Sequence, residues 1–127
     1  MIIAIDFDGT LVEHKYPEIG EDVPLAFETL KDLQNDGHEL ILWTMRCGVH
    51  LNRAVEYCKH KGIEFIGVNY NPSQKGWSDS PKAYAQIYID DAALGCPLVD
   101  ALPRRYVDWG EVRLLLCSMG IDIDITK

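Results

Sequence analysis

Four short, mostly apolar runs divide the chain, and each is followed directly by polar residues. They occupy residues 2–5, 39–43, 63–68 and 86–89 and are rich in Ile, Leu and Val. Apolar runs of this length are typical of strands that are buried on both faces of a parallel sheet. We therefore expect four parallel strands. A short fifth strand near residues 98–99 has no clear pattern to support it.

Helical periodicity separates these runs. In the first connection, apolar side chains recur at intervals of three or four residues, at Val23, Phe27, Leu30 and Leu33. Asp22 is the expected N-cap of this helix, Pro24 suits its first turn and Gly37 follows its last. A second helix is expected over residues 49–61, with an inner face formed by Val49, Ala54, Val55 and Cys58.

Two more helices are expected in the second half of the chain. Ser80 and Pro81 resemble an N-cap followed by proline at the first helical position, which would place Lys82 in the first turn of a short helix. Residues 108–119 are amphipathic and end at Gly120. Strands that alternate with helices predict an α/β fold. We expect a three-layer, Rossmann-like parallel sheet with helices on both faces.

Size, composition and charge narrow the classes of function. The chain has 127 residues, of which 47% are hydrophobic, so a single domain over residues 1–127 can form a proper core. No apolar stretch approaches the length of a membrane span, and Met1 leads directly into the first strand, so we expect a cytoplasmic protein. A formal net charge of −8 disfavours nucleic acid and anionic membranes as partners.

Candidate chemistry gathers where the expected strands end. The residues that follow them are Asp6 and Asp8, Thr44 and Arg46, Asn69 to Asn71, and Asp90 and Asp91. The carboxyl ends of parallel strands share one edge of the sheet, where open α/β folds bind their ligands. We expect these residues to meet there, together with Lys82, which precedes the last strand.

Such a set suits phosphoryl transfer on a magnesium ion. Neighbouring carboxylates repel unless a cation or a shared proton intervenes, and Mg²⁺ prefers oxygen ligands. Asp6 would attack phosphorus, while Asp8 would protonate the leaving oxygen and later deprotonate water. The predicted metal ligands are Asp6, Asp8, Asp90 and Asp91. The predicted phosphate-binding or substrate-binding residues are Gly9, Thr10, Thr44, Arg46 and Lys82.

Two patterns leave other interpretations open. Asp-x-Asp-Gly is also a common turn composition, so the stretch from Asp6 to Gly9 does not by itself distinguish an active site from a turn. Cys47 and Arg53 match the Cys-x5-Arg spacing of cysteine-dependent phosphatases, although a two-residue pattern often matches by chance. The four cysteines otherwise show neither zinc-site nor disulfide spacing.

Residues 69–80 lack any period and form a long connection for so small a domain. Long ordered loops are disproportionately functional. Its notable side chains are Tyr70, Lys75 and Trp77, and Trp77 either lines a substrate pocket or pins the loop to the core. His14, Lys15 and Tyr16, in the loop after the first aspartates, either face a ligand or belong to a solvated surface loop, and the solvated loop is the more common case.

In order and in context, these motifs resemble the four motifs of the haloacid dehalogenase (HAD) superfamily. They are Asp6-Phe7-Asp8-Gly9-Thr10-Leu11, Thr44, Lys82 and Asp90-Asp91, so the resemblance spans residues 1–95. It implies Asp6 as the nucleophile and Asp8 as an acid and base whose backbone carbonyl also contacts Mg²⁺. It further implies Thr44 and Lys82 as phosphate binders and Asp90 or Asp91 as the remaining metal ligand. The second aspartate of the first motif marks phosphotransferases of that superfamily.

The resemblance also implies a capless member, because neither gap between the motifs has room for an inserted cap domain. Capless relatives act on large substrates or use a neighbouring subunit as a lid. We expect a small phosphorylated substrate such as a sugar phosphate, with a homo-oligomer covering the open site. A phospho-accepting signalling module resembling response-regulator receivers is an alternative, but their acceptor aspartate follows a middle strand, whereas the third strand here ends in Asn69.

Overall fold

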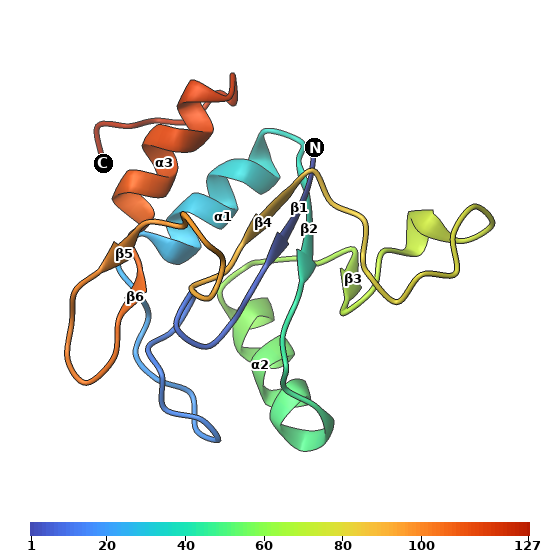
Figure 1. The fold of residues 1–127 in the computed structure, drawn as a ribbon, viewed down its shortest axis with the longest axis horizontal. Coiled ribbons are helices and arrows are strands. Elements are labelled where there is room, and N and C mark those ends of the chain that lie inside the picture. Colours follow the sequence, from blue (N-terminus) through green and yellow to red (C-terminus); the bar gives the residue numbers. More distant parts are fainter.

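A four-stranded parallel sheet forms the centre of the computed structural model, which describes residues 1–127 (Figure 1). Its strands are β1 (Ile2–Ile5), β2 (Glu39–Leu42), β3 (Gly67–Val68) and β4 (Ile87–Ile89), in the spatial order β3-β2-β1-β4. Ile5 lies opposite Leu42 on one side and Ile89 on the other. The predicted α/β fold with four parallel strands is confirmed. The third strand is shorter than predicted, because only Gly67 and Val68 pair with β2.

Three helices cover one face of this sheet. They are α1 (Ala26–Asn35), α2 (Gly48–His60) and α3 (Trp109–Ser118). Side chains alternate across a strand, and Ile3 and Ile5 of β1 share one core cluster with Leu30, Ala54 and Leu116 of the three helices. None of these helices combines the length and the apolar composition that crossing a membrane requires.

The opposite face of the sheet has no helix. Ala4 of β1 and Ile41 of β2 pack there against Ala83 and Ala85, which lie in the irregular connection between β3 and β4. The prediction of helices on both faces is therefore wrong. The physical reason lies in residues 69–86, which carry no helical period, while their two small alanines let an irregular backbone lie close against the sheet.

A buried glutamine gives that connection its shape. Gln74, in the short 3₁₀ helix η1 (Pro72–Gln74), donates from Nε2 to the carbonyl oxygens of Ser80 and Lys82 at 3.2 and 3.0 Å. Its Oε1 accepts from the N–H of Tyr84 at 2.8 Å. The helix predicted to begin at Ser80 is absent, because these backbone groups bind the side chain of Gln74 instead of helical partners.

The chain before α1 also differs from the sequence prediction. The helix begins behind Leu25, which adopts a left-handed conformation (φ 67°), so Asp22 is not its N-cap. The carboxylate of Asp22 instead lies 2.6 Å from the Lys61 ammonium and accepts a hydrogen bond from the Tyr57 hydroxyl. It thereby ties α2 to the start of α1. Val49, expected on the inner face of α2, is 56% exposed.

The C-terminal third adds a hairpin and a helix. The strands β5 (Leu98–Val99) and β6 (Tyr106–Val107) pair antiparallel to each other, outside the main sheet. A strand does therefore occur at residues 98–99, but it does not extend the parallel sheet. The Val107 N–H donates to the carbonyl of Gly9 at 3.0 Å, so the hairpin packs beside the first motif.

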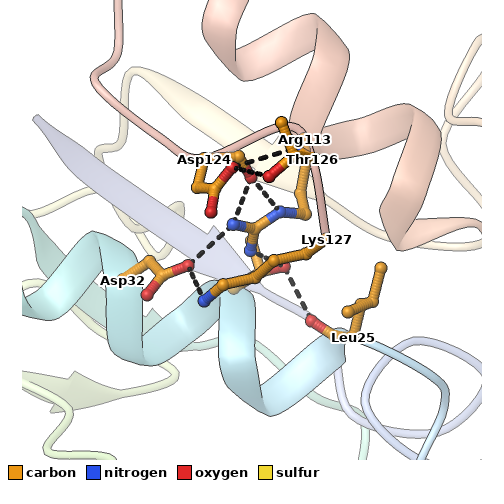
Figure 2. Close-up of polar contacts among 7 residues, drawn as sticks. Leu25, Asp32, Arg113, Asp124, Thr126 and Lys127 are labelled. Carbon is orange, nitrogen blue, oxygen red and sulfur yellow. Dashed lines mark hydrogen bonds and ion pairs between the residues drawn. The ribbon is translucent and has the colours of Figure 1, made fainter.

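A buried arginine fastens the C-terminal tail to α1 (Figure 2). Arg113 of α3 is 1% exposed and donates to Asp32 Oδ2 at 2.7 Å and to Thr29 Oγ1 at 2.9 Å. Its guanidinium also donates to the carbonyl oxygen of Asp124, and the Lys127 ammonium reaches the same Asp32 carboxylate at 3.0 Å. The tail is thus ordered by polar bonds that no periodic pattern in the sequence reveals.

Candidate active site

The carboxyl ends of β1 and β4 lie side by side where the strand order reverses. From β1 the chain adds β2 and β3 on one side and then returns to add β4 on the other. In open α/β sheets such a switch point opens a crevice that binds ligands. Asp6 and Asp8 follow β1, while Asp90 and Asp91 follow β4, and the Asp6 N–H donates to the Ile89 carbonyl at 3.0 Å.

Three of these aspartates converge on one point. One oxygen from each of Asp6, Asp90 and Asp91 lies within 4.8 Å of the other two. Burial, together with the charge of Asp90, raises the pKa of Asp6 to about 8. Burial and the charge of Asp91 raise the pKa of Asp90 as well. Carboxylates this close favour a bound cation, and a set made only of oxygen ligands fits Mg²⁺.

Asp8 stands apart from this cluster. Its Oδ2 and Oδ1 accept from Arg46 Nε and Nη2 at 2.8 and 2.7 Å, which makes a bidentate pair. Its side chain is therefore not one of the converging metal ligands. The backbone carbonyl of Asp8 accepts no backbone hydrogen bond, which leaves it free for the metal contact that the HAD resemblance implies.

Arg46 is engaged entirely within the chain. It is 2% exposed, and besides Asp8 it donates to the carbonyl oxygens of Pro17 and Glu18 at 3.0 and 2.7 Å. Its guanidinium also lies over the rings of Phe7 and Tyr16, 5.0 and 5.1 Å from their centres. The predicted contact between Arg46 and phosphate is not supported by this arrangement. Arg46 instead holds Asp8 and the loop after β1.

Gly9 and Thr10 likewise serve the chain itself. Thr10 is fully buried, and its hydroxyl donates to Asp6 Oδ2 at 2.9 Å and accepts from the Asp91 N–H at 3.2 Å. The N–H of Gly9 donates to the Val12 carbonyl at 2.7 Å. The Gly9 N–H and the Thr10 hydroxyl are therefore both occupied, and neither is free to bind a phosphate as predicted. Thr10 fixes the orientation of the Asp6 carboxylate.

His14 joins the site from the loop after β1. Its Nε2 lies 2.8 Å from Asp91 Oδ2, and the two side chains are only 16% and 17% exposed. A Cβ at Gly9 (φ +81°) would overlap the His14 ring and lie 2.5 Å from Asp91 Oδ2, so glycine is needed for this close approach. The sequence marks His14 only as one of several loop residues, because its partner lies 77 positions away.

A cavity of about 340 Å³ opens beside Asp6. Its lining consists of Asp6, Trp43, Thr44, Met45, Asn69 and Asp90. Thr44 N–H donates to Asn69 Oδ1 at 2.7 Å, and Thr44 Oγ1 accepts from the Arg46 N–H at 3.1 Å, which leaves the hydroxyl proton available to a ligand. Thr44 thus faces the same cavity as Asp6, in keeping with its predicted role.

Lys82 is not brought into this cavity. Its side chain is exposed, and its Nζ lies 5.4 Å from the centre of the Tyr88 ring. Tyr88 lies on β4, and Asp90 follows this strand directly after Ile89. Lys82 is not among the residues that line the cavity, and its role as a phosphate binder stays a prediction.

Cys47 and Arg53 do not form an anion-binding loop. Helix α2 begins directly behind Cys47, and the Leu51 N–H donates to the Cys47 carbonyl. Arg53 is exposed on the outside of α2. A loop that wraps an anion needs successive free N–H groups between the two residues, and a regular helix does not supply them. The structure therefore does not support the cysteine-dependent alternative.

The strand order also argues against the signalling module. Receiver domains have the flavodoxin-like order 2-1-3-4-5, in which the first strand lies between the second and the third. Here β1 lies between β2 and β4. The acidic cluster consequently joins the first and fourth strands of the chain.

Comparison with known proteins identifies a similar solved structure. No family model matches the chain, and no curated protein matches it. A solved structure of a conserved protein coded by a locus from Bacteroides thetaiotaomicron matches with a TM-score of 0.76 and 41% sequence identity. The match covers 96% of this chain and 93% of that one, so the similarity extends over both chains almost completely.

Proposed function

We propose that this chain, which belongs to the same family as the conserved Bacteroides thetaiotaomicron protein, is a cytoplasmic Mg²⁺-dependent phosphatase of the HAD type. It would hydrolyse a phosphate monoester of a small metabolite, such as a sugar phosphate, through an aspartyl phosphate on Asp6. The observation that carries this proposal is the convergence of Asp6, Asp90 and Asp91 beside the cavity that Thr44 lines.

The three converging carboxylates would hold the metal ion. When bound, Mg²⁺ would offset the repulsion among Asp6, Asp90 and Asp91 and draw electron density from a phosphoryl oxygen. Thr10 supports this arrangement, because its hydroxyl binds both the carboxylate of Asp6 and the backbone N–H of Asp91. His14 would orient Asp91 through the 2.8 Å contact, as residues behind metal ligands commonly do.

The first half of the reaction would use Asp6 and Asp8. An oxygen of Asp6 attacks phosphorus, a new O–P bond forms, and the bond from phosphorus to the ester oxygen breaks. Asp8, entering this step protonated, gives its proton to the departing oxygen so that it leaves as an alcohol. Because Arg46 binds both oxygens of Asp8, one of those hydrogen bonds has to open for the proton transfer.

The second half would regenerate the carboxylate. Asp8, now ionised, takes a proton from a water molecule, and the water oxygen attacks the phosphorus of the aspartyl phosphate. The bond between phosphorus and Asp6 breaks, which releases inorganic phosphate and the free Asp6 carboxylate. The hydroxyl of Thr44 and the amide of Asn69 would bind the phosphoryl oxygens from the cavity wall.

The fold supports an open site. The proposed HAD domain occupies residues 1–127 without a cap, and a homo-oligomer would cover the cavity. The net charge of −8 disfavours nucleic acid as a substrate.

The test is hydrolysis of p-nitrophenyl phosphate with Mg²⁺, with EDTA, and by the variants Asp6→Asn and Cys47→Ser. We expect EDTA and Asp6→Asn each to lower kcat on the order of a thousandfold. EDTA removes the metal ion and Asp6→Asn removes the nucleophile, and the proposed reaction needs both. Cys47→Ser is the matched control and should keep full activity, since Cys47 lies outside the cavity. Activity that survives both EDTA and Asp6→Asn would contradict the proposal. Stable phosphorylation without turnover would favour a signalling module.

A further inference from the structure

A second and larger cleft adjoins the cavity beside Asp6. It measures about 640 Å³ and is formed by the irregular segment between β3 and β4, which Figure 1 shows extending away from α1 and α3. Asn69 lines both spaces, so they meet at this residue. A molecule whose phosphate occupies the first cavity can therefore extend its remaining atoms over Asn69 into the cleft.

Two buried amides preform this cleft. Asn71 is 4% exposed, and its side chain accepts from the N–H of Ser73 at 2.9 Å and donates to the Tyr84 carbonyl at 2.9 Å. Gln74 is 7% exposed and binds the backbone at Ser80, Lys82 and Tyr84. These bonds are mostly to the backbone, and Asn71 Oδ1 also accepts from the Ser73 hydroxyl at 2.6 Å. The segment is thus a built wall of the cleft and holds its shape without a ligand.

Other polar groups of the cleft have no partner within the chain. Asn69 Oδ1 accepts from the Thr44 N–H, which fixes the orientation of the amide and leaves its NH₂ group without an acceptor. The ammonium of Lys75 pairs with no carboxylate, although the protein has an excess of eight negative charges. The Tyr70 hydroxyl and the Asp79 carboxylate are likewise exposed and take part in no ion pair or side-chain hydrogen bond.

The balance of these groups indicates what the cleft would bind. They include donors and acceptors, with one positive and one negative charge, and they lie among apolar surface to which Pro72, Pro81 and Ala83 contribute. A hydrophobic leaving group would leave these polar atoms desolvated without partners, which is costly. A leaving group with several hydroxyl groups could satisfy donors and acceptors together.

We propose that the cleft is the leaving-group subsite of the active site and that it binds the hydroxyl-rich alcohol part of a phosphate monoester, with Lys75 and Asp79 as specificity residues. This inference rests on the proposed phosphatase function. In this proposal the segment after β3 selects the substrate, and the carboxylate cluster at Asp6 carries out the reaction common to all substrates.

The test compares a hexose 6-phosphate with p-nitrophenyl phosphate, which has no hydroxyl group to place. Wild type, Lys75→Gln and Asp79→Asn are measured with both, and Lys31→Gln, on the exposed side of α1, is the matched control. We expect the ratio of kcat/KM for the hexose phosphate to that for the aryl phosphate to fall at least about tenfold in each cleft variant, mainly through KM. The control should keep the wild-type ratio. A ratio unchanged in both cleft variants overturns the proposal.

Failure of the phosphatase function would be recognised separately, because neither substrate would then be hydrolysed by wild type. In that case the binding of hexose 6-phosphate is measured by isothermal titration calorimetry. A dissociation constant at least about tenfold higher in Lys75→Gln than in wild type supports the subsite. Equal dissociation constants in the two proteins reject it.

Discussion

The converging carboxylates should make the metal-free protein less stable as pH rises, and Asp6→Asn should remove most of this effect. Burial and Asp90 raise the pKa of Asp6 from 3.8 to about 8. Between these values the folded state holds a proton that the unfolded state has lost. The folded state therefore loses stability as pH rises from about 4 to about 8, and the penalty is complete above the folded pKa.

The magnitude follows from the same pKa values. Each pKa unit is worth about 1.4 kcal/mol, so between pH 5 and pH 8.5 the penalty from Asp6 can grow by at most roughly 4 kcal/mol. Asp6 is partly exposed at the cavity, where water screens its charge, so we expect about 2 kcal/mol. Asparagine keeps an oxygen that can accept the hydrogen bond from Thr10 and carries no charge.

The assay is urea unfolding in EDTA at pH 5 and pH 8.5, for wild type, Asp6→Asn and the exposed control Asp122→Asn. The excess stability of Asp6→Asn over wild type should grow by about 2 kcal/mol between the two pH values, while Asp122→Asn follows wild type. Mg²⁺ should stabilise wild type more than Asp6→Asn, because the variant lacks a ligand. An excess that is the same at both pH values would refute the reasoning.

Three further substitutions test separate parts of the structure. Arg113→Met should lower the free energy of unfolding in urea by about 2–4 kcal/mol, because it leaves the polar partners of a buried guanidinium unpaired, whereas the exposed Arg105→Met should change it by less than about 0.5 kcal/mol. Arg46→Met should slow the hydrolysis of alkyl phosphates more than that of p-nitrophenyl phosphate, because the p-nitrophenolate leaves without a proton from Asp8. Arg46→Lys should restore part of this difference between the two substrates. Equal slowing of both substrates would show that Arg46 acts on folding alone. Gly9→Ala should lower the melting temperature, because a positive φ costs a side chain about 1–2 kcal/mol even before its Cβ meets His14, and an unchanged melting temperature would contradict that account.

The order of strands and motifs was accessible from the sequence because it depends on local patterns. Mostly apolar runs of four to six residues located all four strands, and the polar residues after them located the site at one edge of the sheet. On the same grounds the sequence predicts Asp6, Asp8, Asp90 and Asp91 as metal ligands. The fold brings together oxygens of three of them, while the Asp8 side chain pairs with Arg46. When the strands are assigned correctly, parallel pairing brings the residues that follow them to the same edge of the sheet, because all the carboxyl ends lie there.

The partners of each side chain were not accessible in the same way. Arg46 resembled a phosphate binder by its place after a strand, yet it is buried against Asp8. The segment after β3 was expected to begin a helix at Ser80, but Gln74 binds its backbone first. These outcomes depend on contacts between residues that are not periodic neighbours, and their free energies come from burial that exists only in the folded chain.

The amino-acid sequence by itself therefore determined the α/β class, the four parallel strands and the group of aspartates at their ends, because strand burial and motif spacing are local properties of the chain. Only the tertiary structure decided that all three helices lie on one face and that His14 reaches Asp91. It also decided that a cleft adjoins Asn69. Packing of distant segments sets which face is covered, which polar group is satisfied and which is left free for a ligand.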